Sequence, residues 1–106
     1  MKLFNLKDYI GGWFVGNFSP TIINTKDFEI AIKEYKAGDY EKSHIHKIAK
    51  EITIIVCGEV LMNDIKYYKG DIILIEPNDK TDFNCLTDVI TVVVKIPSIV
   101  GDKYVY

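Results

Sequence analysis

The chain of 106 residues contains no arginine, because all thirteen of its basic residues are lysines. Guanidinium groups are the usual bidentate clamps for phosphate and carboxylate groups. Their absence disfavours sugar phosphates as ligands, although lysine can still hold a phosphate as a point charge. The net charge of −2 also offers no basic face for nucleic acid, so we expect no nucleic-acid partner.

Cysteine and long apolar runs are scarce as well. Cys57 and Cys85 are too few for a disulfide scaffold, and we interpret them as reduced thiols in the core. Residues 1–8 lack the apolar run of a signal peptide, and no apolar segment is long enough to span a bilayer. The sequence therefore predicts a cytoplasmic protein without a membrane partner.

The remaining composition is that of a globular domain, with 26% charged and 48% hydrophobic residues. The length suits one core, and no linker, repeat or low-complexity segment interrupts the chain. We therefore expect a single domain over residues 1–106. Residues 2–10 suggest a short helical turn or an irregular arm.

Short segments rich in Val, Ile, Thr and aromatic residues alternate with turn residues, which is typical of an all-β sandwich or barrel. One turn is expected at Asn63-Asp64, where both residues tolerate positive φ. The apolar run 72–75 is typical of a buried central strand, and both faces of 51–57 are apolar enough to need a cover. The expected strands cover the residues around the two histidines and 13–15, 19–23, 27–36, 51–56, 59–62, 65–68, 72–75, 81–86 and 89–96.

Both histidines of the chain lie close to a carboxylate. His44 and His46 are two residues apart, so on a strand their rings project from the same face. Glu51 begins the next apolar strand, and an antiparallel hairpin of the two strands would bring its carboxylate beside both imidazoles. Two nitrogens and one oxygen form a ligand set suited to a divalent transition metal.

Glycines frame this stretch at a spacing that resembles a known signature. Five residues separate Gly38 from His44, one separates His44 from His46, four lead to Glu51, and six more to Gly58. This spacing resembles the first motif of the cupin superfamily without a departure. The resemblance implies that His44, His46 and Glu51 bind a metal.

The second cupin motif is matched only in part. Gly70 fits, Pro77 comes one place late, and Thr81 stands where the motif has its last metal-binding histidine. Strict counting also puts Asn78 and Cys85 at the glycine and asparagine positions of the motif. Cupins usually have three histidines and one glutamate as metal ligands, so this chain would keep three of the four ligands and lose one. Asp82 could replace the missing histidine only if a bulge or shift of one residue turned it inward.

The resemblance covers about residues 28–97 and implies a cupin-type double-stranded β-helix, or jelly-roll barrel. The N-terminal arm and the apolar tail 98–106 would pack on this body or on a partner, and a homodimer is expected. The metal, namely iron, manganese, nickel or zinc, would lie in a pocket with open coordination positions. The protein would then act on or bind a small oxygen-bearing molecule, with dioxygenase-like or isomerase-like chemistry.

Three alternatives remain open at this stage. The sequence from His44 to Lys47 also resembles the metal-free sugar-nucleotide ketoisomerase or epimerase cupins, in which His44 or His46 would act as acid or base with Tyr35. A non-catalytic module that binds a sugar or similar ligand is the second alternative. The third is a polar cluster in which the histidines form hydrogen bonds to Glu51 and Thr81 without an ion.

Side chains alternate between the two faces of a strand, and on this ground we expect the pocket lining to include Lys33, Tyr35, Thr81 and Phe83.

Overall fold

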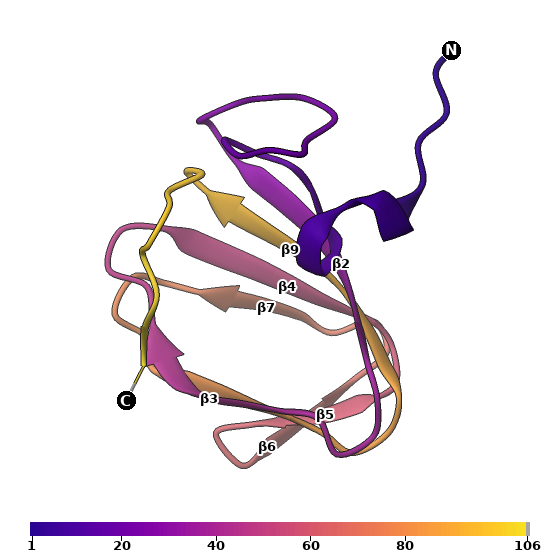
Figure 1. Cartoon of the computed structure of the whole chain (residues 1–106). Coiled ribbons are helices and arrows are strands. Elements are labelled where there is room, and N and C mark those ends of the chain that lie inside the picture. The colour runs from indigo at the N-terminus through magenta and orange to yellow at the C-terminus, as the bar shows by residue number, and fades with distance from the viewer. Residues whose placement is uncertain (106) are drawn as a thin grey trace.

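The computed structural model describes residues 1–105, and Tyr106 of the predicted tail lies outside the described residues. The chain forms two five-stranded antiparallel sheets (Figure 1). In spatial order, sheet A contains β1 (Trp13–Val15), β2 (Glu29–Tyr35), β9 (Val89–Ile96), β4 (Lys50–Cys57) and β7 (Ile72–Ile75). In spatial order, sheet B contains β10 (Tyr104–Val105), β3 (Tyr40–Ile45), β8 (Thr81–Cys85), β5 (Glu59–Met62) and β6 (Ile65–Tyr68).

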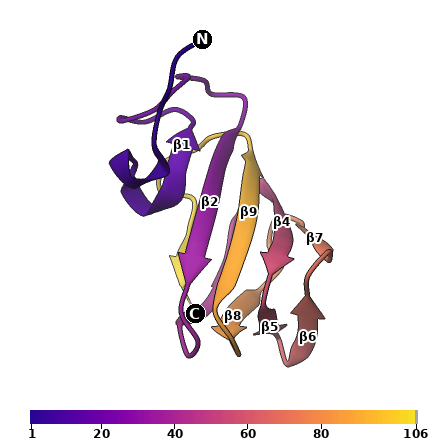
Figure 2. The same cartoon turned by 90° about the vertical axis from the view of Figure 1, so that its right-hand side faces the viewer.

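The chain crosses repeatedly between the sheets, which is the arrangement of a jelly roll. Strand β4 of sheet A follows β3 of sheet B, β7 of sheet A follows β6 of sheet B, and β9 of sheet A follows β8 of sheet B. The sheets lie face to face, with β9, β4 and β7 opposite β3, β5 and β6 in Figure 1, and Figure 2 shows the strands of sheet A side by side. The prediction of an all-β jelly-roll barrel is therefore confirmed.

Within the described residues, helical structure is limited to the N-terminal arm. Two 3-10 turns of three residues each, η1 (Leu6–Asp8) and η2 (Ile10–Gly12), precede β1. Within residues 1–105 no helix is long and apolar enough to cross a membrane.

Inward-facing side chains change from apolar to polar along the strands, so the interior has an apolar end and a polar end. On β4, Ile55 is buried in the core, while Thr53 and Glu51 face a cavity. On β9, Val89 belongs to the core and Lys95 lines the cavity. One end of the barrel is therefore filled by an apolar cluster of Ile55, Val60, Met62, Ile75, Phe83, Cys85 and Val89.

Two predicted turns have the geometry that their residues favour. Asn63 and Asp64 adopt φ values of 51° and 65° and join β5 to β6 as a two-residue hairpin turn. Gly58, at φ +92°, joins β4 to β5, and a Cβ atom there would stand 2.2 Å from the carbonyl oxygen of Asp88. Only glycine permits this close approach of two backbone segments.

The prediction that the histidine strand and the Glu51 strand form a hairpin is wrong. Strand β3 pairs with β8 and β10, whereas β4 pairs with β7 and β9, so the two strands lie in different sheets. Residues 46–49 carry the chain across from sheet B to sheet A. Glu51 consequently approaches the histidines from the facing sheet.

Two further strand predictions need correction. The apolar run Ile72–Ile75 forms the edge strand β7, not a central strand, and its outward side chains Ile72 and Leu74 are 68% and 55% exposed. Residues 19–23 form no strand. There two backbone hydrogen bonds, from the Ile22 N–H to the Phe14 carbonyl and from the Gly16 N–H to the Ile23 carbonyl, join the segment to β1 and the turn after it. The Thr21 hydroxyl also accepts from the Gly16 N–H, so these bonds hold a loop and not a ladder.

The C-terminal segment fastens the loop that crosses between the sheets. Strand β10 pairs with β3. The buried carboxylate of Asp102 accepts hydrogen bonds from the backbone N–H groups of Lys47, Ile48 and Ala49 at 3.1, 3.1 and 2.9 Å. Burial works to raise the pKa of Asp102, but the three donors hold it below the ordinary value of 3.8.

We expect the substitution Asp102→Asn to lower the free energy of unfolding by about 2 kcal/mol, because the charge that satisfies three buried donors is lost. Urea unfolding at neutral pH measures the change. Asp27→Asn is the matched control, because Asp27 is exposed and should shift the free energy by less than about 0.5 kcal/mol. Equal stability of the two variants would contradict the tethering role.

Candidate functional site

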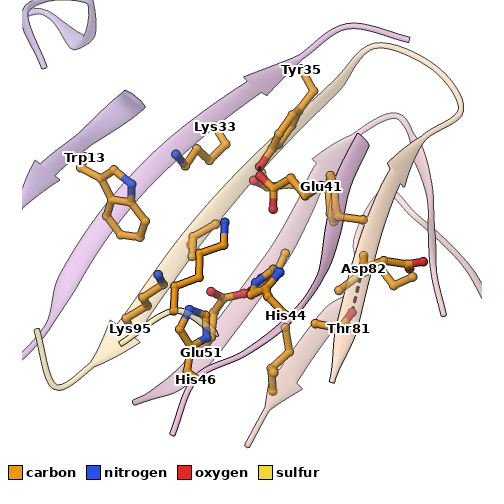
Figure 3. Close-up of a pocket in the computed structure, with 17 residues that line it drawn as sticks. Trp13, Lys33, Tyr35, Glu41, His44, His46, Glu51, Thr81, Asp82 and Lys95 are labelled. Carbon is orange, nitrogen blue, oxygen red and sulfur yellow. Dashed lines mark hydrogen bonds between the residues drawn. The ribbon is translucent and has the colours of Figure 1, made fainter. Parts of the chain in front are cut away.

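A cavity of about 200 Å³ lies between the sheets at their polar end (Figure 3). It is lined by Trp13, Lys33, Tyr35, Glu41, His44, His46, Glu51, Thr53, Met62, Ile75, Thr81, Asp82, Phe83, Thr91, Val93, Lys95 and Lys103. Every predicted metal, catalytic or pocket residue is among them. The structure thus brings together predicted side chains that the sequence distributes over the four strands β2, β3, β4 and β8 and the loop that follows β3.

His44 is held in a defined orientation at the end of β3. Its Nδ1 lies 2.9 Å from the carbonyl oxygen of Lys42. A carbonyl only accepts, so Nδ1 must carry the proton and Nε2 keeps its lone pair for a ligand. The ring stands edge-on to that of His46, with 5.3 Å between the centroids.

His46 is buried, and its Nε2 has no hydrogen-bond partner within the described part of the chain. Burial lowers the pKa of His46 to about 4, and the positive charge of Lys95 adds to this effect. The ring is therefore neutral at pH 7, which is the form that binds a metal. A buried polar atom without a hydrogen-bond partner lowers the stability of the fold. We therefore expect Nε2 of His46 to bind an acceptor or a ligand.

Glu51 lies at the start of β4, and Figure 3 shows its carboxylate beside the two histidines. One of its oxygens accepts a hydrogen bond from the Thr53 hydroxyl at 3.0 Å. Neither histidine is hydrogen-bonded to Glu51 or Thr81 among residues 1–105, so the polar cluster considered above is not formed.

The donor set fits a divalent transition metal in ligand type, and the partnerless Nε2 of His46 is the structural observation in its favour. As the side chains of residues 1–105 are placed, no three His, Cys, Asp or Glu residues enclose a metal ion. Binding would therefore require His44, His46 and Glu51 to draw together.

Thr81 takes the inward position of the second motif, and Asp82 does not replace it. Thr81 is buried opposite His44, and its hydroxyl donates to the carbonyl oxygen of Asp82. The Asp82 carboxylate accepts a hydrogen bond of 2.7 Å from the Asn63 N–H. This bond holds Asp82 at the turn between β5 and β6, on the rim of the cavity.

Tyr35 faces the cavity beside Phe83, with 5.0 Å between the ring centroids. Its hydroxyl donates a hydrogen bond of 3.0 Å to Glu41. Burial, together with the negative charge of Glu41, raises the pKa of Tyr35 far above its ordinary value of 10.0. Tyr35 is therefore a neutral hydrogen-bond donor at physiological pH.

Sequence reasoning missed Glu41, because alternation from His44 places it on the outer face. The pairing of β3 with β8 shifts register between Glu41, opposite Phe83, and His44, opposite Thr81. Three steps on β3 match two on β8, which is a β-bulge, so both Glu41 and His44 face inward. Local sequence carries no signal for this bulge.

Two further polar residues come from β9. Thr91 is fully buried and its hydroxyl has no partner within the described residues, while Lys95 reaches the mouth of the cavity. Alternation along β9 from Thr91 through Val93 to Lys95 could have predicted both positions. Trp13 of β1 also lines the cavity, although a single tryptophan near the start of the chain gives no signal of this position.

The chain has the cupin fold: two antiparallel sheets form a jelly roll with an apolar end and a polar pocket that is lined by the histidines and the glutamate of the first motif. A Klebsiella pneumoniae protein with a double-stranded β-helix domain is 19% identical, over 98% of this chain and 90% of its own, with a TM-score of 0.72. An RmlC-like cupin from Desulfovibrio desulfuricans is 22% identical, over 71% of this chain and 76% of its own, with a TM-score of 0.64. The DMSP lyase DddQ from Ruegeria pomeroyi is 16% identical, over 88% of this chain and 49% of its own, with a TM-score of 0.72. No family model and no curated protein matches the sequence.

We expect Tyr35 to stay protonated at pH 10, the ordinary pKa of a tyrosine, because burial and the negative charge of Glu41 raise its pKa. Tyr35→Phe should therefore leave the phenolate absorbance of the protein at pH 10 unchanged. Circular dichroism at that pH verifies that both proteins are folded. A lower phenolate absorbance in the variant would contradict the neutral state of Tyr35.

Proposed function

We propose that the cavity binds a divalent transition metal through His44, His46 and Glu51, and that the protein acts on or binds a small oxygen-bearing molecule there. The observation that carries the proposal is the buried, partnerless Nε2 of His46 beside the free Nε2 of His44. The donor types favour iron, manganese, nickel or zinc. When bound, such an ion supplies Lewis acidity to oxygen atoms that reach it.

The surrounding side chains prepare the site for this role. The Lys42 carbonyl fixes the tautomer of His44, and the Thr53 hydroxyl orients Glu51. Tyr35 offers a hydroxyl to a ligand oxygen, and the apolar cluster closes the far end of the cavity to water. A cavity of about 200 Å³ restricts the ligand to a small molecule. Dioxygenase-like or isomerase-like chemistry is the reaction class that we infer.

A non-catalytic binding module is the second candidate. Thr81 occupies the inward position where cupins have their fourth ligand, and this loss favours a change of chemistry. The metal-free ketoisomerase alternative has less support, because Tyr35 is held neutral by burial and by Glu41 and so is a weak proton donor.

A cytoplasmic location stays a prediction.

Elemental analysis of protein purified without chelators or a histidine tag tests metal binding. We expect close to one divalent ion per chain, and its loss in a variant that combines His44→Ala and His46→Ala. Glu51→Gln should weaken binding at least tenfold, because a charged ligand becomes neutral. Glu59→Gln is the control, because Glu59 pairs with Lys66 away from the cavity. A parent protein that carries no metal and gains none on soaking would refute the proposal.

We also propose that the protein forms a homodimer through the outer face of sheet A. This face carries exposed apolar side chains on β4, β7 and β9, among them Val56, Ile72, Leu74, Ile90 and Ile96. A contiguous apolar surface on a sheet, continued by an edge strand, favours burial against another copy.

Leu74→Lys should convert such a dimer to a monomer, because the charge would be buried in the interface. Sedimentation velocity measures the mass in solution. Ile65→Lys is the matched control, because Ile65 is comparably exposed but belongs to sheet B. A wild-type protein that sediments as a monomer would contradict this proposal.

A further inference from the structure

Two lysines and the single tryptophan form one wall of the cavity. Lys33 extends inward from β2 and Lys95 from the neighbouring strand β9. Their Nζ atoms lie 5.2 and 5.0 Å from the centre of the Trp13 ring. Figure 3 shows Trp13 and Lys33 on one side of the cavity, and Lys95 between them and the candidate ligands Glu51 and His46.

Neither ammonium group forms a close ion pair at this wall. Both side chains are half-buried, and in the described chain neither has a carboxylate within 4.0 Å. The nearest acidic neighbours of Lys95 along the ladder are Glu29 and Glu51, which accept hydrogen bonds from Ser98 and Thr53. Burial raises the pKa of Glu29 and the charge of Lys95 opposes this, so the attraction between the two acts without a direct contact.

Charge that is partly removed from water favours a counter-ion. Burial lowers the pKa of Lys33, and the positive charges of Lys95 and Lys103 act in the same direction against the attraction of Glu41. The two lysines therefore repel each other beside the indole ring. An anion placed between them would relieve both the repulsion and the loss of hydration.

We propose that Lys33, Lys95 and Trp13 form an anion subsite that holds a carboxylate or phosphate group of the molecule bound in the cavity. The inference rests on the proposed function, because it assigns a charged group to the ligand of the same site. Glu41 and Glu51 line the cavity as well and repel an anion, so the charged group is directed to the lysine wall. The remaining oxygens of the ligand then face His44 and His46.

The cavity limits the size of this anion. At a water volume of about 30 Å³, its 200 Å³ holds roughly seven molecules of water, and hence a ligand of comparable atom count. The inferred ligand class is a small hydroxy or keto acid, or a phosphate of similar size. The indole ring would pack against its carbon atoms.

Trp13 makes the subsite directly observable, because it is the only tryptophan of the chain. Metal-free protein is titrated with lactate, with inorganic phosphate and with lactamide, while indole fluorescence is recorded. Lactamide has the shape of lactate without its charge. We expect saturable binding of lactate or phosphate and at least tenfold weaker binding of lactamide, and the stronger anion identifies the carboxylate or the phosphate as the group held.

Lys33→Met and Lys95→Met keep the apolar stem and remove the charge, and each should raise the dissociation constant about tenfold. Lys95→Arg keeps the charge and should retain binding. Lys69→Met is the control for an exposed lysine. Thermal unfolding verifies that each variant is folded, and Lys33→Met and Lys95→Met should retain the metal content of the parent protein.

The outcomes separate this inference from the proposed function. Anion binding that is unchanged in both methionine variants, or equal for lactate and lactamide, would overturn the subsite even if the metal is present. An absence of saturable anion binding in the parent protein would overturn it as well. A protein that binds the anion through the lysines but takes up no metal would support the subsite and refute the metal proposal.

Discussion

The crossing of the chain between the two sheets at residues 46–49 determines where the candidate ligands meet. His44 and His46 end their run in one sheet, and Glu51 begins the next strand in the other. Facing sheets stand roughly 10 Å apart, a gap that side chains from both walls can bridge. The loop cannot satisfy its N–H groups in a ladder, and the Asp102 carboxylate does so instead.

The interior then sets the chemical state of the groups it encloses. The apolar cluster removes water from one end of the barrel, and the same burial keeps His46 and Tyr35 neutral. The side chains of Lys33 and Lys95 are half-buried at another part of the wall. One gradient of burial therefore produces a floor of electron-donating groups and a wall with two lysines, and together they favour a small ligand whose two ends differ in charge.

Much of this fold could be predicted from residue patterns that act locally. Alternation and turn residues indicated the strands, and Asn63-Asp64 indicated a hairpin that the structure contains. Strand partners were harder, because adjacent strands commonly pair, whereas β3 and β4 separate into different sheets. An apolar run such as Ile72–Ile75 does not distinguish an edge from a centre, since the covering surface lies elsewhere in the chain. The inward position of Glu41 depends on a bulge that only the pairing with β8 reveals.

The close contact at Gly58 shows that the first motif combines two kinds of information. A side chain at Gly58 would collide with the backbone at Asp88, so this position is required for the two segments to pass each other, whatever the pocket contains. His44, His46 and Glu51 line the cavity instead. Gly58 of the motif is thus required by the path of the backbone, whereas the polar residues of the motif affect the chemistry of the cavity. A chain could therefore keep the glycine and exchange the polar residues, and it would still have the fold after its reaction had changed.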